Sequence, residues 1–206
     1  MAKMQTNLEN ILKMEKRFRV NFINSLSGFK SLNLAATINP GSKVTNLAPV
    51  SSVIHVGATP PLLGMLMRPD SVPRHTLQNI VEFGFWTLNH VKKDFFKQAH
   101  QTSARYSDNV SEFDAVGLHE EYLNFPAPFV KESVLKIGLS LEEKIDLKVN
   151  GTHFLIGKIE TVLVPESCVK EDGFIDLEQA GTITVSGLDC YHSTEKIERL
   201  PYAKPD

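Results

Sequence analysis

The feature that most constrains the fold is a series of short β-rich runs separated by residues that favour turns. Two of these runs, SLNLAATIN (31–39) and VTNLAPVSSVIHVG (44–57), flank Pro40-Gly41-Ser42-Lys43, and together they predict a β-hairpin. Two more, VLKIGLSLEEKIDL (134–147) and THFLIGKIETVLV (152–164), are joined through Asn150-Gly151, which favours a type I′ hairpin turn. Strands that follow one another through turns indicate a barrel rather than a sheet of alternating strands and helices.

Helical patterns interrupt these strands. Apolar residues spaced along the first 18 positions predict an amphipathic helix capped by Asn7, with Gly28 as a later stop. A second helix is expected over 74–84, after Pro73, and a third within 91–107. The runs 62–67 and 85–91 are expected to be strands.

The rest of the chain shows less regular patterning. Residues 111–128 are interpreted as a long excursion with little regular structure, and residues 166–206 as loops, one short helix and a tail. No repeat or flexible linker divides the sequence. We therefore expect one domain over 1–206, in which residues 1–30 form a helical extension.

Composition excludes several classes of protein. Apolar residues make up 42% and charged residues 22%, which fits neither a disordered chain nor a membrane protein. The net charge of -2 gives no general attraction to nucleic acid or to an anionic membrane. The two cysteines form no C-x-x-C pair, and the N-terminus lacks the continuous apolar core of a signal peptide. A cytoplasmic location is expected.

The usual catalytic signatures are absent from the sequence. It contains no G-x-G-x-x-G, P-loop, H-E-x-x-H or G-x-S-x-G motif. Seven histidines are widely spread, and none is paired at spacing i, i+4 with a carboxylate nearby. We therefore expect no metal site.

One part of the sequence does carry the groups that hold a phosphate. Phosphate monoesters are bound by backbone N–H groups, hydroxyls and preferably an arginine, and the helix near Pro73 could add free N–H groups. By residue type alone, an ordinary strand, turn and helix cap is the more ordinary interpretation, and a phosphate site stays open beside it. The residues are Asn46, Leu47, Ala48, Pro49, Ser51, Arg68, Thr76 and Asn79.

Four fragments in this part of the chain resemble the flavin reductase-like family in order and spacing. They are NLAPVSSV (46–53), PPLLGMLMRP (60–69), RHTLQNIVEFGFWTLNHV (74–91) and SEFDAVGL (111–118). The family typically has N-L-A-P-[FY]-S, P-P-L-V-x-F, an Arg-Pro or similar step, D-T-x-x-N-I, a V-N strand and S-E-F-x-x-x-G-L. The resemblance covers roughly 44–118, and a weaker likeness continues to residue 164.

The resemblance implies a mainly β, Greek-key-like split β-barrel with peripheral helices. It also implies a homodimer that binds one noncovalent FMN per site near the subunit interface. Residues 46–49 match the strand that passes the isoalloxazine, and Ser51 matches a serine expected to bond the ring or the ribityl chain. Arg68, Thr76 and Asn79 match positions on the phosphate side.

The activity implied is hydride transfer from NADH or NADPH to the bound flavin, and from there to an unidentified electron acceptor. Backbone N–H groups near Ala48 and the Ser51 hydroxyl would polarise the ring. An FMN-binding electron-transfer protein or flavin carrier without direct NAD(P)H activity stays open as the alternative.

The sequence departs from the family pattern at several positions close to the expected site. Val50 replaces an aromatic residue, His75 an acidic one and His119 a frequent threonine, while His55 lies near a common asparagine. His55 and His90 could touch a ligand, although packed or surface histidines are the more ordinary interpretation.

Overall fold

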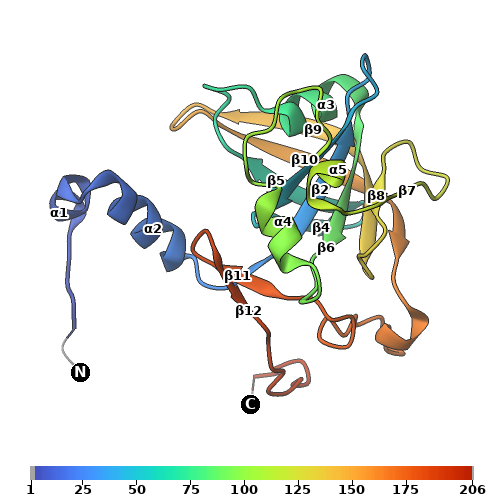
Figure 1. Ribbon diagram of the computed structural model, residues 1–206. Coiled ribbons are helices and arrows are strands. Elements are labelled where there is room, and N and C mark those ends of the chain that lie inside the picture. Colours follow the sequence, from blue (N-terminus) through green and yellow to red (C-terminus); the bar gives the residue numbers. More distant parts are fainter. Residues whose placement is uncertain (1–2, 206) are drawn as a thin grey trace.

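The computed structural model describes residues 3–205, and Figure 1 shows a β-barrel body from which the N-terminal helices project. The helices are α1 (Leu8–Lys13), α2 (Lys16–Leu26), α3 (His75–Phe83), α4 (Phe96–Gln101), α5 (Glu112–Val116) and the 3-10 helix η1 (Glu166–Cys168). The first six strands are β1 (Lys30–Ser31), β2 (Asn33–Ile38), β3 (Thr45–Val50), β4 (Val53–Ala58), β5 (Pro61–Met67) and β6 (Phe85–His90). The others are β7 (Glu120–Glu121), β8 (Phe129–Val130), β9 (Lys136–Leu147), β10 (Thr152–Leu163), β11 (Thr184–Ser186) and β12 (Cys190–His192).

The main sheet has seven antiparallel strands in the order β3-β2-β6-β9-β10-β5-β4. Its two edge strands, β3 and β4, follow each other in the sequence with only Ser51 and Ser52 between them. The sheet must therefore curl until its edges approach at these two serines, and it stays open elsewhere because β3 and β4 do not pair. The mainly β fold and the split barrel expected from the sequence are confirmed.

Strand β2 is buried on both faces, which explains its continuous apolar pattern. Leu34 and Ala36 pack in a cluster with residues of α4, α5 and the C-terminal strands. Ala35 packs in a second cluster inside the barrel, where Leu77 and Ile80 of α3 close one end. Each cluster also contains a residue of β3, Leu47 in the first and Val50 in the second. The strand that carries the expected site therefore packs against both clusters.

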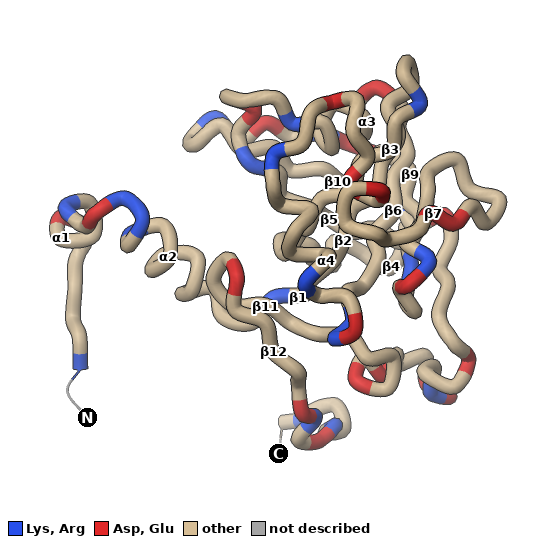
Figure 2. The backbone as a smooth tube through the Cα atoms, in the orientation of Figure 1, with Lys and Arg blue, Asp and Glu red and all other residues tan. Residues whose placement is uncertain are grey.

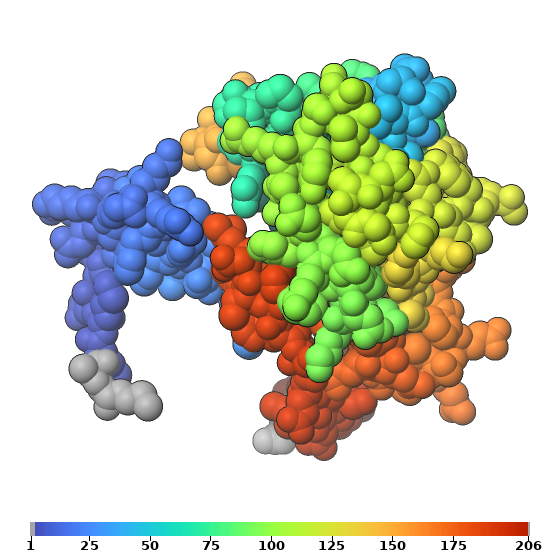
Figure 3. Space-filling view, in the orientation of Figure 1, coloured from blue at the N-terminus to red at the C-terminus, as the bar shows by residue number. Residues whose placement is uncertain are grey.

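Residues 3–29 stand apart from this body, as Figure 3 shows. Asn7 caps α1 by accepting a hydrogen bond from the backbone N–H of Asn10 (3.0 Å), as the sequence predicts. The single helix expected here is divided at Met14 into α1 and α2, and neither contains a buried residue. Charged residues are spread along both the projecting helices and the body (Figure 2).

Several local predictions need correction. Asn150-Gly151 does not form a two-residue turn, because β9 ends at Leu147 and four residues connect it to β10; only Gly151 has positive φ (72°). The helix expected over 91–107 is confined to α4, and residues 111–128 contain α5 and β7. The C-terminal part forms strands, since β11 pairs with β1 and β12. Among the helices of residues 3–205, none is long and apolar enough to cross a membrane.

Candidate functional site

The outer edge of β3 is the centre of the candidate site. Backbone groups of an antiparallel strand face its neighbour and the open edge at alternate residues. Val44 accepts a hydrogen bond from the Asn39 N–H (2.9 Å), whereas the Leu47 N–H donates to Glu112 rather than to β2. This alternation turns the backbone groups of Ala48 toward β2 and those of Leu47 and Pro49 toward the open edge. The Ala48 N–H is therefore not free to polarise a bound ring, contrary to the expectation above.

Glu112 occupies part of this open edge. It lies in the first turn of α5, its Oε2 accepts the Leu47 N–H at 2.9 Å, and only 6% of the residue is exposed. Burial raises the pKa of its carboxyl group, while the bond from Leu47 and the nearby His75 oppose part of that rise. Sequence reasoning gave Glu112 no role, although the S-E-F fragment was the signal that could have found it.

Asn46, Thr76 and Asn79 are brought together where β3 begins. Asn46 Nδ2 donates to Thr76 Oγ1 (2.9 Å), and Asn79 Nδ2 donates to Thr37 Oγ1 (3.0 Å), with Thr37 directly opposite Asn46 in the sheet. All four residues are buried. These bonds fasten the first turns of α3 to β2 and β3. Contact of Thr76 or Asn79 with a cofactor stays a prediction.

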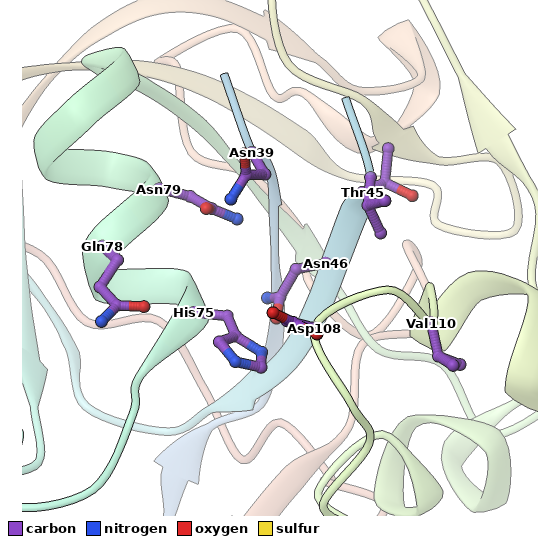
Figure 4. Close-up of a pocket in the computed structure, with 9 residues that line it drawn as sticks. Asn39, Thr45, Asn46, His75, Gln78, Asn79, Asp108 and Val110 are labelled. Atoms are coloured by element: carbon purple, nitrogen blue, oxygen red, sulfur yellow. The ribbon is translucent and has the colours of Figure 1, made fainter. Parts of the chain in front are cut away.

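A small polar cavity of about 30 Å³ opens beside these residues. In Figure 4, His75 and Asn79 extend from α3 toward β3, which carries Asn46. Asp108 contributes a carboxylate to the lining, so this end of β3 carries negative charge from Asp108 and from nearby Glu112 when they are ionised. The cavity is large enough for water but far smaller than a ligand pocket.

Ser51 and Arg68 lie at the other end of β3. The Leu66 N–H donates to Ser52 C=O (3.3 Å) and the Ser52 hydroxyl donates to Leu66 C=O (2.7 Å), which sets the exit of β5 beside the two serines. Ser51 is half-buried and Arg68 is exposed, and neither side chain forms a hydrogen bond or ion pair with the residues that the structure describes. Both keep their polar groups available.

The expected residues thus form two groups separated by the length of β3. At about 3.3 Å per residue, Asn46 and Ser51 are about 16 Å apart along the chain. No hydrogen bond within residues 3–205 links Arg68 to Thr76 or Asn79. The pairing of Ser52 with Leu66 brings the exit of β5, which leads to Arg68, toward the Ser51 end of β3.

A larger cleft, of about 360 Å³, lies elsewhere on the body. It contains none of the eight expected residues. Its lining comprises Lys92, Asp94, Phe95, Gln98, Gly117, Leu118 and Glu132.

The other histidines singled out by the sequence lie away from β3. The His119 Nδ1 lies 2.6 Å from Glu132 at the surface, and His55 is exposed on β4. His90 is paired with Thr182 (3.2 Å), and burial lowers its pKa to about 4, so its ring is neutral at pH 7. No group of three potential metal ligands occurs within the described part of the chain.

Comparisons with known proteins place this geometry in context. The family model for the flavin reductase like domain matches residues 32–178. A solved structure from Shewanella frigidimarina NCIMB 400, a candidate flavin reductase with a split-barrel domain, is 53% identical; it covers 98% of this chain and 100% of its own, with a TM-score of 0.93.

Two more distant structures share the fold. Nitrilotriacetate monooxygenase component B from Bacillus cereus is 21% identical, with 97% of this chain and 100% of its own covered at a TM-score of 0.82. An FMN-binding protein from Thermus thermophilus, solved with bound 1-cyclohex-2-enone, is 13% identical, with coverages of 98% and 99% at a TM-score of 0.69.

Proposed function

Because this chain belongs to the flavin reductase-like family, we propose that it is an FMN-dependent oxidoreductase whose electron donor is NADH or NADPH. A flavin-related oxidoreductase function follows from the family and from the 53% identical relative. FMN, rather than another flavin, and the nicotinamide donor belong to the proposal. The FMN-binding protein of the same fold supports the choice of cofactor.

The observation that carries the proposal is the open edge of β3 with unused polar groups at its Ser51 end. The outward C=O group of Pro49, which is half-buried, is an acceptor suited to the ring N–H of a flavin, whereas Leu47 is fully buried. The Ser51 hydroxyl follows along the strand, where it suits the ribityl chain, and the Arg68 guanidinium suits the phosphate. This order along β3 matches the order of groups along FMN.

The charges around β3 also favour binding of the phosphate at the Ser51 end. A phosphate with about two negative charges is disfavoured beside Asp108 and Glu112 and favoured beside Arg68. We therefore assign Thr76 and Asn79 a supporting role, in which they hold α3 against the strand that carries Asn46.

Bound FMN would supply the electron-transfer chemistry, and the chain supplies binding, orientation and the exclusion of water. Glu112 fixes the position of the β3 edge through Leu47, so the neighbouring C=O groups keep a constant direction. No acid or base from the chain is required, which fits the absence of the usual catalytic motifs.

A homodimer is part of the proposal. Ligand pockets for a molecule of this size measure about 300–1,000 Å³, whereas the cavity beside β3 measures about 30 Å³. A flavin on the open edge would stay largely uncovered unless a second copy closed over it. We also propose a cytoplasmic location, which the two unpaired cysteines, Cys168 and Cys190, support.

Anaerobic mixing tests the proposed activity. FMN-loaded protein should absorb at about 450 nm. This band should disappear on addition of NADH or NADPH, and it should disappear faster than the band of free FMN at the same concentration. The Lys92→Ala variant, altered only in the larger cleft, should behave like the wild type. Bleaching by dithionite alone would support an electron carrier, and failure to bind FMN would contradict the proposal altogether.

A further inference from the structure

The N-terminal arm, defined here as residues 3–29, meets the body of its own chain at its base, where Phe29 lies edge-on to His192 with the ring centroids 4.9 Å apart, and its apolar side chains farther out are exposed. Eight of the 25 exposed large hydrophobic side chains found among residues 3–205 lie in this short segment. The rings of Phe18 and Phe22 stack with their centroids 6.2 Å apart. Ile23 and Leu26 extend this apolar surface of α2, and they are 45% and 67% exposed, respectively.

The length of the arm helices makes this exposure unfavourable. α1 has 6 residues and α2 has 11. Isolated helices shorter than about 12–15 residues are marginal in water, so packing of an apolar face normally stabilises them. Burial of one side chain such as Phe18 or Leu26 contributes about 1.5–3 kcal/mol. The arm therefore requires a surface that its own body does not provide.

The arm is nevertheless held in a definite direction at its base. Lys30 Nζ donates to Asn24 C=O (3.2 Å) and to Gly187 C=O (3.0 Å), which ties the end of α2 to the turn between β11 and β12. Superposition of the 53% identical relative covers 98% of this chain and so extends into the arm.

A second uncovered apolar surface lies on the outside of the barrel. Register places Ile54, Gly64 and Ile156 side by side on the face opposite the core residues Met65 and Leu155. None of its apolar side chains belongs to either core cluster. We call this surface the outer patch; it comprises Ile54, Val56, Leu66, Ile145, Phe154 and Ile156.

Exposure of the outer patch is high for apolar strand residues. Ile54 is 55% exposed, and Val56 and Leu66 are each 39% exposed. Val56 and Phe154 both lie over Gly64, whose missing side chain leaves room for them on this face. Contiguous apolar surfaces of this kind mark interaction sites.

Charge indicates what covers these two surfaces. Residues 1–29 contain five Lys or Arg and two Glu, a net charge of +3, so the other 177 residues carry -5 within the total of -2. On the outer-patch face Glu143 lies beside Ile156, and Lys158, which is paired with Glu142 and Glu160, lies two residues farther along β10. A second copy of the chain would therefore bring a basic apolar arm to an acidic body with an uncovered apolar patch.

We propose that the arm of each copy docks on the outer patch of a second copy, in a two-fold symmetric dimer. Each interface then contains one arm and one patch, and symmetry buries both pairs at once. This inference builds on the proposed homodimer but does not require that flavin be bound.

Sedimentation velocity of the full-length chain, measured without flavin, tests the proposal. The wild type should be a dimer, and Phe18→Asp and Ile54→Asp should each raise the dimer dissociation constant at least about tenfold, because each places a charge in the apolar contact. Asn21→Asp on the polar side of α2 and Val149→Asp, 91% exposed in the β9–β10 loop, are matched controls that should stay dimeric. Circular dichroism of every variant should show unchanged folding of the body.

Cross-linking adds a second readout that does not depend on destabilising the dimer. Ile23→Cys and Leu66→Cys, combined in a Cys190→Ser background, should give a covalent dimer with a short bismaleimide, whereas Ile23→Cys with Val149→Cys should not. A monomeric wild type, unchanged dissociation constants for both Asp variants, or a cross-link confined to one chain would overturn the proposal. These outcomes are independent of FMN binding, so they are distinct from a failure of the proposed activity.

Discussion

Substitution of Glu112 tests how the β3 edge is held. In Glu112→Ala the Leu47 N–H loses its acceptor, and Leu47 is fully buried. An unsatisfied buried N–H costs about 1–3 kcal/mol, and hydrogen bonds to charged groups contribute about 1.5–3 kcal/mol, so we expect a loss of about 2–3 kcal/mol. For a chain of this length that lowers Tm by about 5–10 °C, measurable by calorimetry.

Glu112→Gln is the matched variant, because its side-chain oxygen still accepts the bond without a charge. Burial raises the pKa of Glu112 in the folded protein above its ordinary value of 4.5, so the folded state binds this proton more tightly than the unfolded state does. The stability of the wild type relative to Glu112→Gln should therefore fall as pH rises from about 4.5 through the folded pKa. Urea unfolding between pH 4 and pH 7 measures this difference. A difference that does not change with pH, or a Glu112→Ala variant as stable as the wild type, would refute the reasoning.

Two further substitutions probe the frame around the site. Thr76→Val removes the acceptor of the buried Asn46 amide and should cost about 1–3 kcal/mol in urea unfolding, whereas Thr76→Ser should stay close to the wild type; equal losses would exclude this bond as the cause. Gly157→Ala would place a Cβ 2.4 Å from Cη2 of Trp86 and should destabilise the barrel by about 1–3 kcal/mol or more, with altered fluorescence of the single tryptophan. Unchanged fluorescence and stability would show that Trp86 has room to move.

The local parts of the fold were predictable because their causes are local. The Pro40-Gly41 turn, the Asn7 cap and the end of α3 at Gly84, which has φ 81°, depend on neighbouring residues. Pairing of β1 with β11, by contrast, joins Lys30 to Val185, and neither run carries a sign of its partner. The two-residue turn predicted from Asn150-Gly151 does not form, because the pairing of the long strands β9 and β10 ends at Leu147 and Thr152 and leaves a four-residue loop.

The candidate site also has features that follow from local sequence and features that depend on distant residues. The eight residues were predicted from motifs that lie close together in the sequence. Their grouping into two ends of β3 depends on how the sheet curls, and the contact of Glu112 with Leu47 spans 65 residues. Side-chain types predicted a phosphate-binding stretch, but only the structure shows that Arg68 and Ser51 keep free polar groups while Thr76 and Asn79 hold the frame.

The most direct test of the account is the ratio of FMN to riboflavin affinity, since these ligands differ only in the phosphate. Calorimetric titration of the wild type should show tighter binding of FMN, and Arg68→Ala should weaken FMN by about 10- to 150-fold, equivalent to about 1.5–3 kcal/mol, while leaving riboflavin unchanged. Lys92→Ala should leave both affinities unchanged. An Arg68→Ala variant with the wild-type preference for FMN, or a preference lost in Lys92→Ala instead, would contradict the assignment of the phosphate to the Ser51 end of β3.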